Sequence, residues 1–176
     1  EVQRKFFGTL YNTYSFFALY ANIDGFKYAE DDIPLAERPE IDRWILSELN
    51  TLILQVQDGM DNFEPTRAYR PIQEFVNDKL SNWYVRLCRR RFWKGEYGQD
   101  KIAAYQTLYT CMATVTKLGA ALAPFFMERL FQDLNAVTGL EKVASVHLTD
   151  FPKADKKAID TELEEKMHLA QNLSSL

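Results

Sequence analysis

The sequence has few of the residues from which disulfide frameworks and metal sites are built. It contains two cysteines, Cys88 and Cys111, and two histidines, His147 and His168, and no two of them lie at the spacing of metal ligands. Neither cysteine belongs to a C-x-x-C motif, and both fall in stretches with a helical pattern. We therefore predict two free thiols with packing roles, in a reducing compartment, and no metal site.

Membrane spans and familiar catalytic motifs are missing as well. LGAALAPFFM at 118–127 is among the longest apolar runs, and it stops at Glu128, short of the roughly 18 residues of a membrane span. The chain has no GxxxxGK[ST] phosphate loop, no GxGxxG after a strand, no GxSxG elbow and no HExxH. The amino terminus EVQRKFFG has neither a secretory pattern nor an initiator methionine. We predict a non-catalytic chain that does not enter a membrane and is cut from a longer protein.

The most frequent pattern in the sequence is a repeat of apolar residues at helical spacing. Hydrophobic residues make up 47% of the chain and aromatic residues 14%, which is typical of a globular domain with large buried side chains. In the range 2–21 they are so frequent that this helix should be buried on several sides or meet a neighbouring domain. One stripe of it is formed by Phe6, Leu10, Tyr14, Phe17 and Ala21.

The spacing predicts further helices with short breaks between them. These should run from about Pro39 to 56, from Pro65 to about Trp93, over 101–122, over 125–137 and, as a polar amphipathic helix, over 156–176. The helix that begins at Pro65 should carry a core stripe of Ile72, Val76, Leu80, Trp83 and Leu87. The breaks should be 22–39, 57–63 and 94–100, and 145–152 should be one extended strand or a loop.

The predicted fold class is therefore all-α. We expect an antiparallel helical bundle of four to five helices in residues 1–140. Residues 141–176 should form a short extended connector and the start of a C-terminal junction helix.

One window of the chain contains no acidic residue. From Lys79 to Lys94 it carries six basic residues, whereas the whole chain has a net charge of −4, so the remainder carries −10. Cations near a helix end complement its macrodipole by about 0.3–1 kcal/mol each, and arginines can pair with acids on neighbouring helices. These two effects account for one or two arginines. They do not account well for three consecutive ones, because like charges repel each other. The alternative is a phosphate-binding surface with aromatic stacking, and the residues alone leave both interpretations open.

Four segments, in this order, resemble the anticodon-binding helical domain of class I aminoacyl-tRNA synthetases. They are NTYSFFALYANIDGF (12–26), IDRWILSELN (41–50), FEPTRAYRPIQEFVNDKLSNWYVRLCRRRFW (63–93) and LAPFFMERLFQDL (122–134). The run SNWYVRxxRRRFW at 81–93 is similar to isoleucyl-tRNA synthetases in particular. Valyl-tRNA synthetases share the second and fourth segments, so a valyl domain is the alternative within the family.

The resemblance implies a domain that holds tRNA but does not charge it. The family's catalytic signatures His-Ile-Gly-His and Lys-Met-Ser-Lys-Ser are absent, so the use of ATP, with magnesium, and of isoleucine would belong to the parent enzyme. This piece, expected to be monomeric and cytoplasmic, would bind the anticodon stem and loop of an isoleucine tRNA, with its first helix against the parent's catalytic domain.

By position in the basic window, we assign two kinds of RNA contact. Phosphate contacts are expected from Arg86, Arg89, Arg90, Arg91 and Lys94, and base stacking from Trp93. Two further arginines, Arg67 and Arg70, are expected to pair with Glu64 and Glu74 at helical spacing rather than to form a second basic site. From another class, a helical protein–protein interaction module with no RNA role would also fit the aromatic first helix.

Overall fold

The computed structural model describes residues 3–174, with side chains from residue 5. Residues 1, 2, 175 and 176 lie outside the described residues; residue 2 belongs to the first predicted helix, and residues 175 and 176 belong to the last. The helices are η1 (Gln3–Phe7, π), α1 (Gly8–Asp24), η2 (Leu35–Glu37, 3-10), α2 (Glu40–Asp61), α3 (Pro65–Glu74), η3 (Phe75–Val85, π), α4 (Arg86–Trp93), α5 (Gln99–Leu118), α6 (Pro124–Thr138), η4 (Val146–Leu148, 3-10), η5 (Lys156–Ala158, 3-10) and α7 (Thr161–Ser174). The described part of the chain contains no strand, which confirms the all-α prediction.

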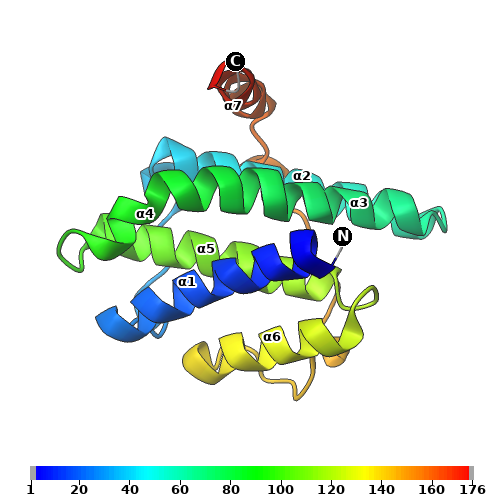
Figure 1. Ribbon diagram of the computed structural model, residues 1–176, viewed down its shortest axis with the longest axis horizontal. Coiled ribbons are helices and arrows are strands. Elements are labelled where there is room, and N and C mark those ends of the chain that lie inside the picture. The colour runs from blue at the N-terminus through cyan, green and yellow to red at the C-terminus, as the bar shows by residue number, and fades with distance from the viewer. Residues whose placement is uncertain (1–2, 175–176) are drawn as a thin grey trace.

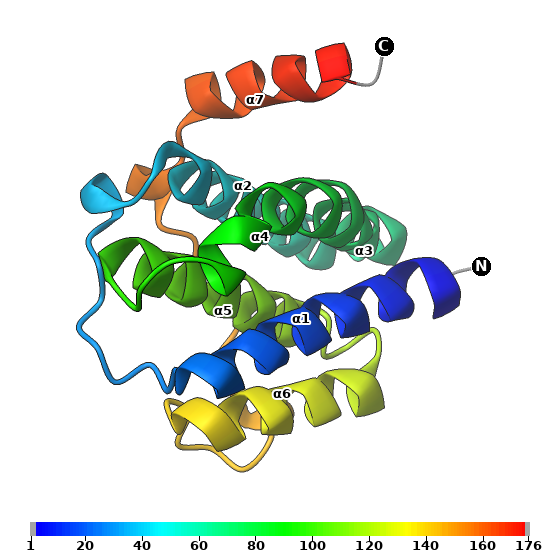
Figure 2. The same cartoon turned by 60° about the vertical axis from the view of Figure 1, so that its left-hand side comes forward.

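The long helices form a bundle in which successive rods run in opposite directions (Figures 1 and 2). α3, η3 and α4 join end to end as one rod that lies beside α2. α5 lies in the middle and is buried on most of its surface, with Tyr105, Leu108 and Met112 fully enclosed. α1 and α6 cover its other side. The helix starts predicted at about Pro39, at Pro65 and at 125 are confirmed to within one residue, because Pro39 directly precedes α2 and Pro65 and Pro124 open α3 and α6.

The break predicted at 57–63, between α2 and α3, begins later than expected. Residues 57–61 were expected to end the second helix, but α2 continues to Asp61. Gly59 lies inside α2, and a Cβ built on it would lie 2.6 Å from the backbone nitrogen of Ala68 in α3. The glycine therefore serves a close approach between two helices rather than a turn.

The predicted core stripe is wrong beyond Leu80 in the rod formed by α3, η3 and α4. Ile72, Val76 and Leu80 are buried as expected, but Trp83 is only half-buried and Leu87 is 53% exposed. Beyond Leu80 the buried positions are Tyr84, Val85, Cys88 and Phe92. In an α-helix each four-residue step turns the face by about 40°, whereas the wider π turns of η3 rotate it in the opposite direction and offset this drift. Pro71 lies inside α3 without ending it.

The C-terminal segment packs on the bundle through its first half. Val146 and Leu163 belong to the same hydrophobic core as the long helices. Glu164 accepts hydrogen bonds from Ser47 Oγ (2.5 Å) and Thr51 Oγ1 (2.9 Å) of α2. The second half of α7 extends beyond these contacts, with Leu169 and Leu173 exposed (Figure 2).

The first helix buries the predicted stripe except for Tyr14, which is half-buried. On its other side Tyr11, Leu19 and Ile23 are exposed. No helix within residues 3–174 combines the length and apolar character needed to cross a membrane.

Candidate nucleic-acid interface

One side of α4 presents cations and an aromatic ring to solvent. Arg86, Arg89, Arg90 and Trp93 are exposed and follow one another at the i, i+3, i+4 and i+7 spacing of a single helix face. Lys94, also exposed, follows directly. We call these five residues the basic face. Within the described residues, its four cations form no ion pair and no hydrogen bond through their side chains.

The opposite side of α4 fixes the orientation of this face. Cys88 and Phe92 are buried there. The Phe92 ring meets Phe16 of α1 edge-on at 5.2 Å between ring centroids, and Tyr105 of α5 at 5.1 Å. Because the buried side is packed against two other helices, the arginines on the exposed side cannot turn inward without losing these contacts.

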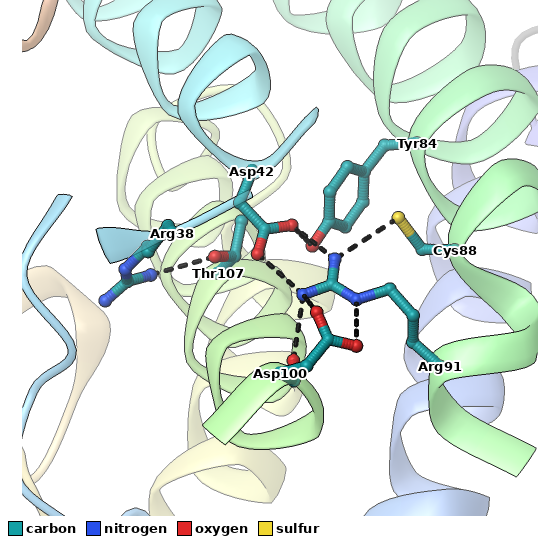
Figure 3. A network of polar contacts seen from close by, with 7 residues as sticks. All are labelled: Arg38, Asp42, Tyr84, Cys88, Arg91, Asp100 and Thr107. Atoms are coloured by element: carbon teal, nitrogen blue, oxygen red, sulfur yellow. Dashed lines mark hydrogen bonds and ion pairs between the residues drawn. The ribbon is translucent and has the colours of Figure 1, made fainter. Parts of the chain in front are cut away.

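Arg91 belongs to the interior rather than to the basic face (Figure 3). Its Nη1 and Nη2 atoms donate to both carboxylate oxygens of Asp42, at 2.7 and 2.8 Å. Nε donates to Asp100 Oδ2 at 3.1 Å, and Nη2 also donates to the Asp100 carbonyl at 2.8 Å. With its donors engaged, the side chain is 15% exposed. This geometry argues against the phosphate contact expected for Arg91 and agrees, for this residue, with internal ion pairing.

The Arg91 pair is part of a buried polar network. Asp42 is fully buried and also accepts a hydrogen bond from the Tyr84 hydroxyl at 2.7 Å. Burial opposes the charge of Arg91, but the hydrogen bonds and charge of Asp42 outweigh it and raise the pKa of the guanidinium. Burial and the charge of Asp42 likewise raise the pKa of Tyr84, which keeps its hydroxyl a donor. The network therefore joins the start of α2 to the rod that carries the basic face.

Lys79, the first cation of the acid-free window, is also used internally. Its ammonium pairs with Glu48 of α2, whose side chain is 7% exposed. Two of the six cations, Lys79 and Arg91, thus stabilise the bundle, and the other four lie at the surface. Internal ion pairing, one of the two interpretations that the sequence left open, therefore holds for two residues of the window.

Comparison with known proteins identifies the domain that carries this face. A family model described as "Anticodon-binding domain of tRNA ligase" matches residues 42–176. The isoleucine–tRNA ligases of Bacteroides thetaiotaomicron and Cytophaga hutchinsonii are 62% and 65% identical over all 176 residues, and that of Dehalococcoides mccartyi (strain CBDB1) is 52% identical. The chain belongs to the isoleucine–tRNA ligase family. It spans 15–17% of the length of these relatives and corresponds to their anticodon-binding domain.

Within the anticodon-binding domain, the turn after the basic face contains an aromatic residue that sequence reasoning missed. Tyr97 is 40% exposed and lies between Gly95, whose φ is +96°, and Gly98. Its hydroxyl donates a hydrogen bond to Glu30 in the segment between α1 and α2. Burial and this bond raise the pKa of Tyr97. The available signal was an aromatic residue in a glycine-bracketed turn next to a basic window.

Arg67 and Arg70 lie at the other end of the rod, on α3. Arg67 pairs with Glu64 at 3.0 Å, as expected, and also with Asp58 at 2.8 Å. Arg70 is exposed and forms no ion pair with the part of the chain that the structure describes, so its expected pairing with Glu74 is not found.

Proposed function

We propose that the basic face binds the anticodon stem and loop of an isoleucine tRNA. The observation that carries this proposal is the set of four exposed cations, three on α4 and Lys94 directly after it, that have no partner among the described residues and lie next to the exposed ring of Trp93. An isolated cluster of like charges destabilises a fold unless something neutralises it. A polyanion supplies that neutralisation.

The chemistry of the face divides into two parts. Arg86, Arg89, Arg90 and Lys94 would contact phosphates, since guanidinium groups offer planar pairs of donors that match phosphate oxygens. Trp93 is 59% exposed at the end of the helix and would stack on an unpaired base of the loop. Arg91 would contribute indirectly, by holding the end of α4 against α2 and α5.

The test is binding of an isoleucine tRNA by the chain with Arg89→Ala and Arg90→Ala combined, across a salt series. Each lost phosphate contact lowers the slope of log affinity against log salt by about 0.7–0.9, so the double variant should lose about 1.4–1.8. A matched control is Arg67→Ala with Arg129→Ala, which removes the same charge from exposed, ion-paired arginines on other helices. Equal weakening by both pairs would contradict the site and leave only a general charge effect.

The same measurement, repeated with a swapped anticodon, asks whether the domain reads bases. A drop in affinity on the swap would assign base reading to this domain. Equal affinities with a steep salt slope would mean that the basic face positions the backbone while selection lies elsewhere in the ligase.

A further part of the proposal concerns the longer protein to which this chain would belong. We infer that the longer protein joins isoleucine to tRNA with ATP and magnesium, and we assign no residue of this chain to those groups. The exposed Tyr11, Leu19 and Ile23 on α1 support a contact with the parent's catalytic domain. We also expect a cytoplasmic location and a monomeric chain.

The exposed side of α1 equally favours a second candidate, a protein–protein interaction module. Sedimentation of the chain at rising concentration separates the two. Self-association that Leu19→Ser abolishes, in a chain that does not bind tRNA, would favour the module. A monomer that binds tRNA favours the anticodon-binding role.

A further inference from the structure

Tyr97 combines an exposed ring with a fixed position. Tyr97 belongs to the turn between α4 and α5, three residues after Lys94. This turn is at the left-hand end of the molecule in Figure 1. It is 40% exposed, although the hydroxyl at its far end is hydrogen-bonded to Glu30. A tyrosine that only filled space would be expected to bury its ring and leave its hydroxyl in water, which is the reverse of this arrangement.

The segment that holds Glu30 is itself tied to the bundle. Gln106 of α5 accepts from the Ile33 backbone N–H at 3.0 Å and donates to the Asp31 carbonyl at 3.0 Å. Arg38 donates to the Ile33 carbonyl at 2.9 Å and to Thr107 at 2.8 Å. Glu30 is therefore an anchor on a fixed segment, and the Tyr97 ring loses little freedom when something stacks on it.

The charges around Tyr97 differ from those of the basic face. Glu30 contacts its hydroxyl, and Glu96 precedes it in the chain. The second carboxylate oxygen of Glu30, Oε2, is buried and has no hydrogen-bond partner in the structure. Phosphate is disfavoured beside these carboxylates, whereas an unpaired base is neutral and has an aromatic face.

We propose that Tyr97 is a second base-stacking residue of the interface and that Glu30 is its positioning residue. The ligand is an unpaired base of the RNA loop whose phosphates lie on the basic face, so this inference rests on the proposed tRNA binding. The basic face, which includes Trp93, would bind one part of the loop, and Tyr97 would bind a base that reaches past Lys94.

The experiment uses anticodon stem–loops of an isoleucine tRNA in which 2-aminopurine replaces the loop bases one at a time. Stacking on an aromatic ring quenches this fluorophore. With the unaltered chain, we expect quenching at one loop position that Tyr97→Ala abolishes, together with about a tenfold loss of affinity. Tyr97→Phe keeps the ring and should keep the quenching. Tyr11→Ala, which removes an exposed tyrosine ring from α1, is the matched control and should change neither quantity.

A double-mutant cycle tests the role of Glu30. Glu30→Ala should weaken binding in the unaltered chain but not in Tyr97→Phe, because the phenylalanine has no hydroxyl to anchor. Glu30→Gln keeps an acceptor and should restore most of the affinity. A structural role of Glu30 alone would give equal losses in both backgrounds and would overturn the positioning role.

The outcomes separate this inference from the function beneath it. If the stem–loop binds and Arg89→Ala with Arg90→Ala weakens it, but Tyr97→Ala leaves affinity and quenching unchanged, Tyr97 is not a stacking residue. If the unaltered chain does not bind the stem–loop at low salt, the proposed function fails and this inference fails with it.

Discussion

Replacing Asp42 with asparagine removes the buried negative charge on which the network of Figure 3 depends. The substitution keeps the shape of the side chain and leaves an oxygen that can accept from Tyr84. Arg91 loses its two-bond carboxylate partner, although its contacts with Asp100 remain. The asparagine also brings an amide NH2 group into the fully buried position of Asp42.

The size of the effect follows from burial. Removing one partner of a buried ion pair costs about 3–5 kcal/mol, because the other charge stays buried without compensation. Arg91 is 15% exposed and keeps Asp100, whose side chain is 61% exposed, so the lower end applies. About 3 kcal/mol corresponds to a fall in Tm of roughly 6–12 °C for a chain of this size.

The assay is urea unfolding followed by circular dichroism, with thermal unfolding as a second measure. Asp133→Asn is the control, since its partner Arg129 is an exposed residue one turn away and the pair should contribute little. If Asp42→Asn and Asp133→Asn shift the midpoint equally, the network is not a source of stability. A large loss of stability without any loss of tRNA affinity in the remaining folded protein would instead refute the indirect role of Arg91 at the interface.

Three further predictions concern packing, thiols and the exposed tryptophan. Gly59→Ala should destabilise the chain by about 1–3 kcal/mol in urea unfolding, although alanine favours helices, because its Cβ would overlap Ala68; a more stable variant would contradict the close approach. Burial raises the pKa of Cys88 to about 11, so Cys88 and the fully buried Cys111 should react slowly with iodoacetamide at pH 8, and fast labelling of the native chain would refute their burial. The free energy of unfolding should also fall as pH rises from about 9, where the thiol of the unfolded chain ionises, towards 11. Tryptophan fluorescence should change on tRNA binding in the unaltered chain but not in Trp93→Phe, and an unchanged response of that variant would remove Trp93 from the interface.

Helix positions were predictable because local residues determine them. Pro39, Pro65 and Pro124 each mark a start, and the left-handed conformation of Gly139 after α6 marks an end. The break expected at 57–63 was misplaced because the same residue type has two uses. A glycine can release a helix or let another backbone approach, and only the position of Ala68 decides between them.

The candidate site was predictable as a window but not residue by residue. Three consecutive arginines have the same chemistry, and the pairing of Arg91 depends on Asp42, which lies 49 positions away in the sequence. The contact of Tyr97 spans 67 positions. Such pairings follow from how the rods pack, and no local pattern of the basic window contains that information.

The register of the rod explains why these arginines diverge. In a regular α-helix continued from Leu80, the buried stripe would pass through Trp83 and Leu87 and bring Arg90 to its edge. The π turns of η3 shift the buried stripe to Tyr84, Cys88 and Phe92. This shift turns Arg90 to solvent beside Arg86 and Arg89, and it turns Arg91 towards Asp42. The helix register therefore separates the arginines of this window. Arg91 points inward and pairs with Asp42, whereas Arg86, Arg89 and Arg90 remain exposed to solvent.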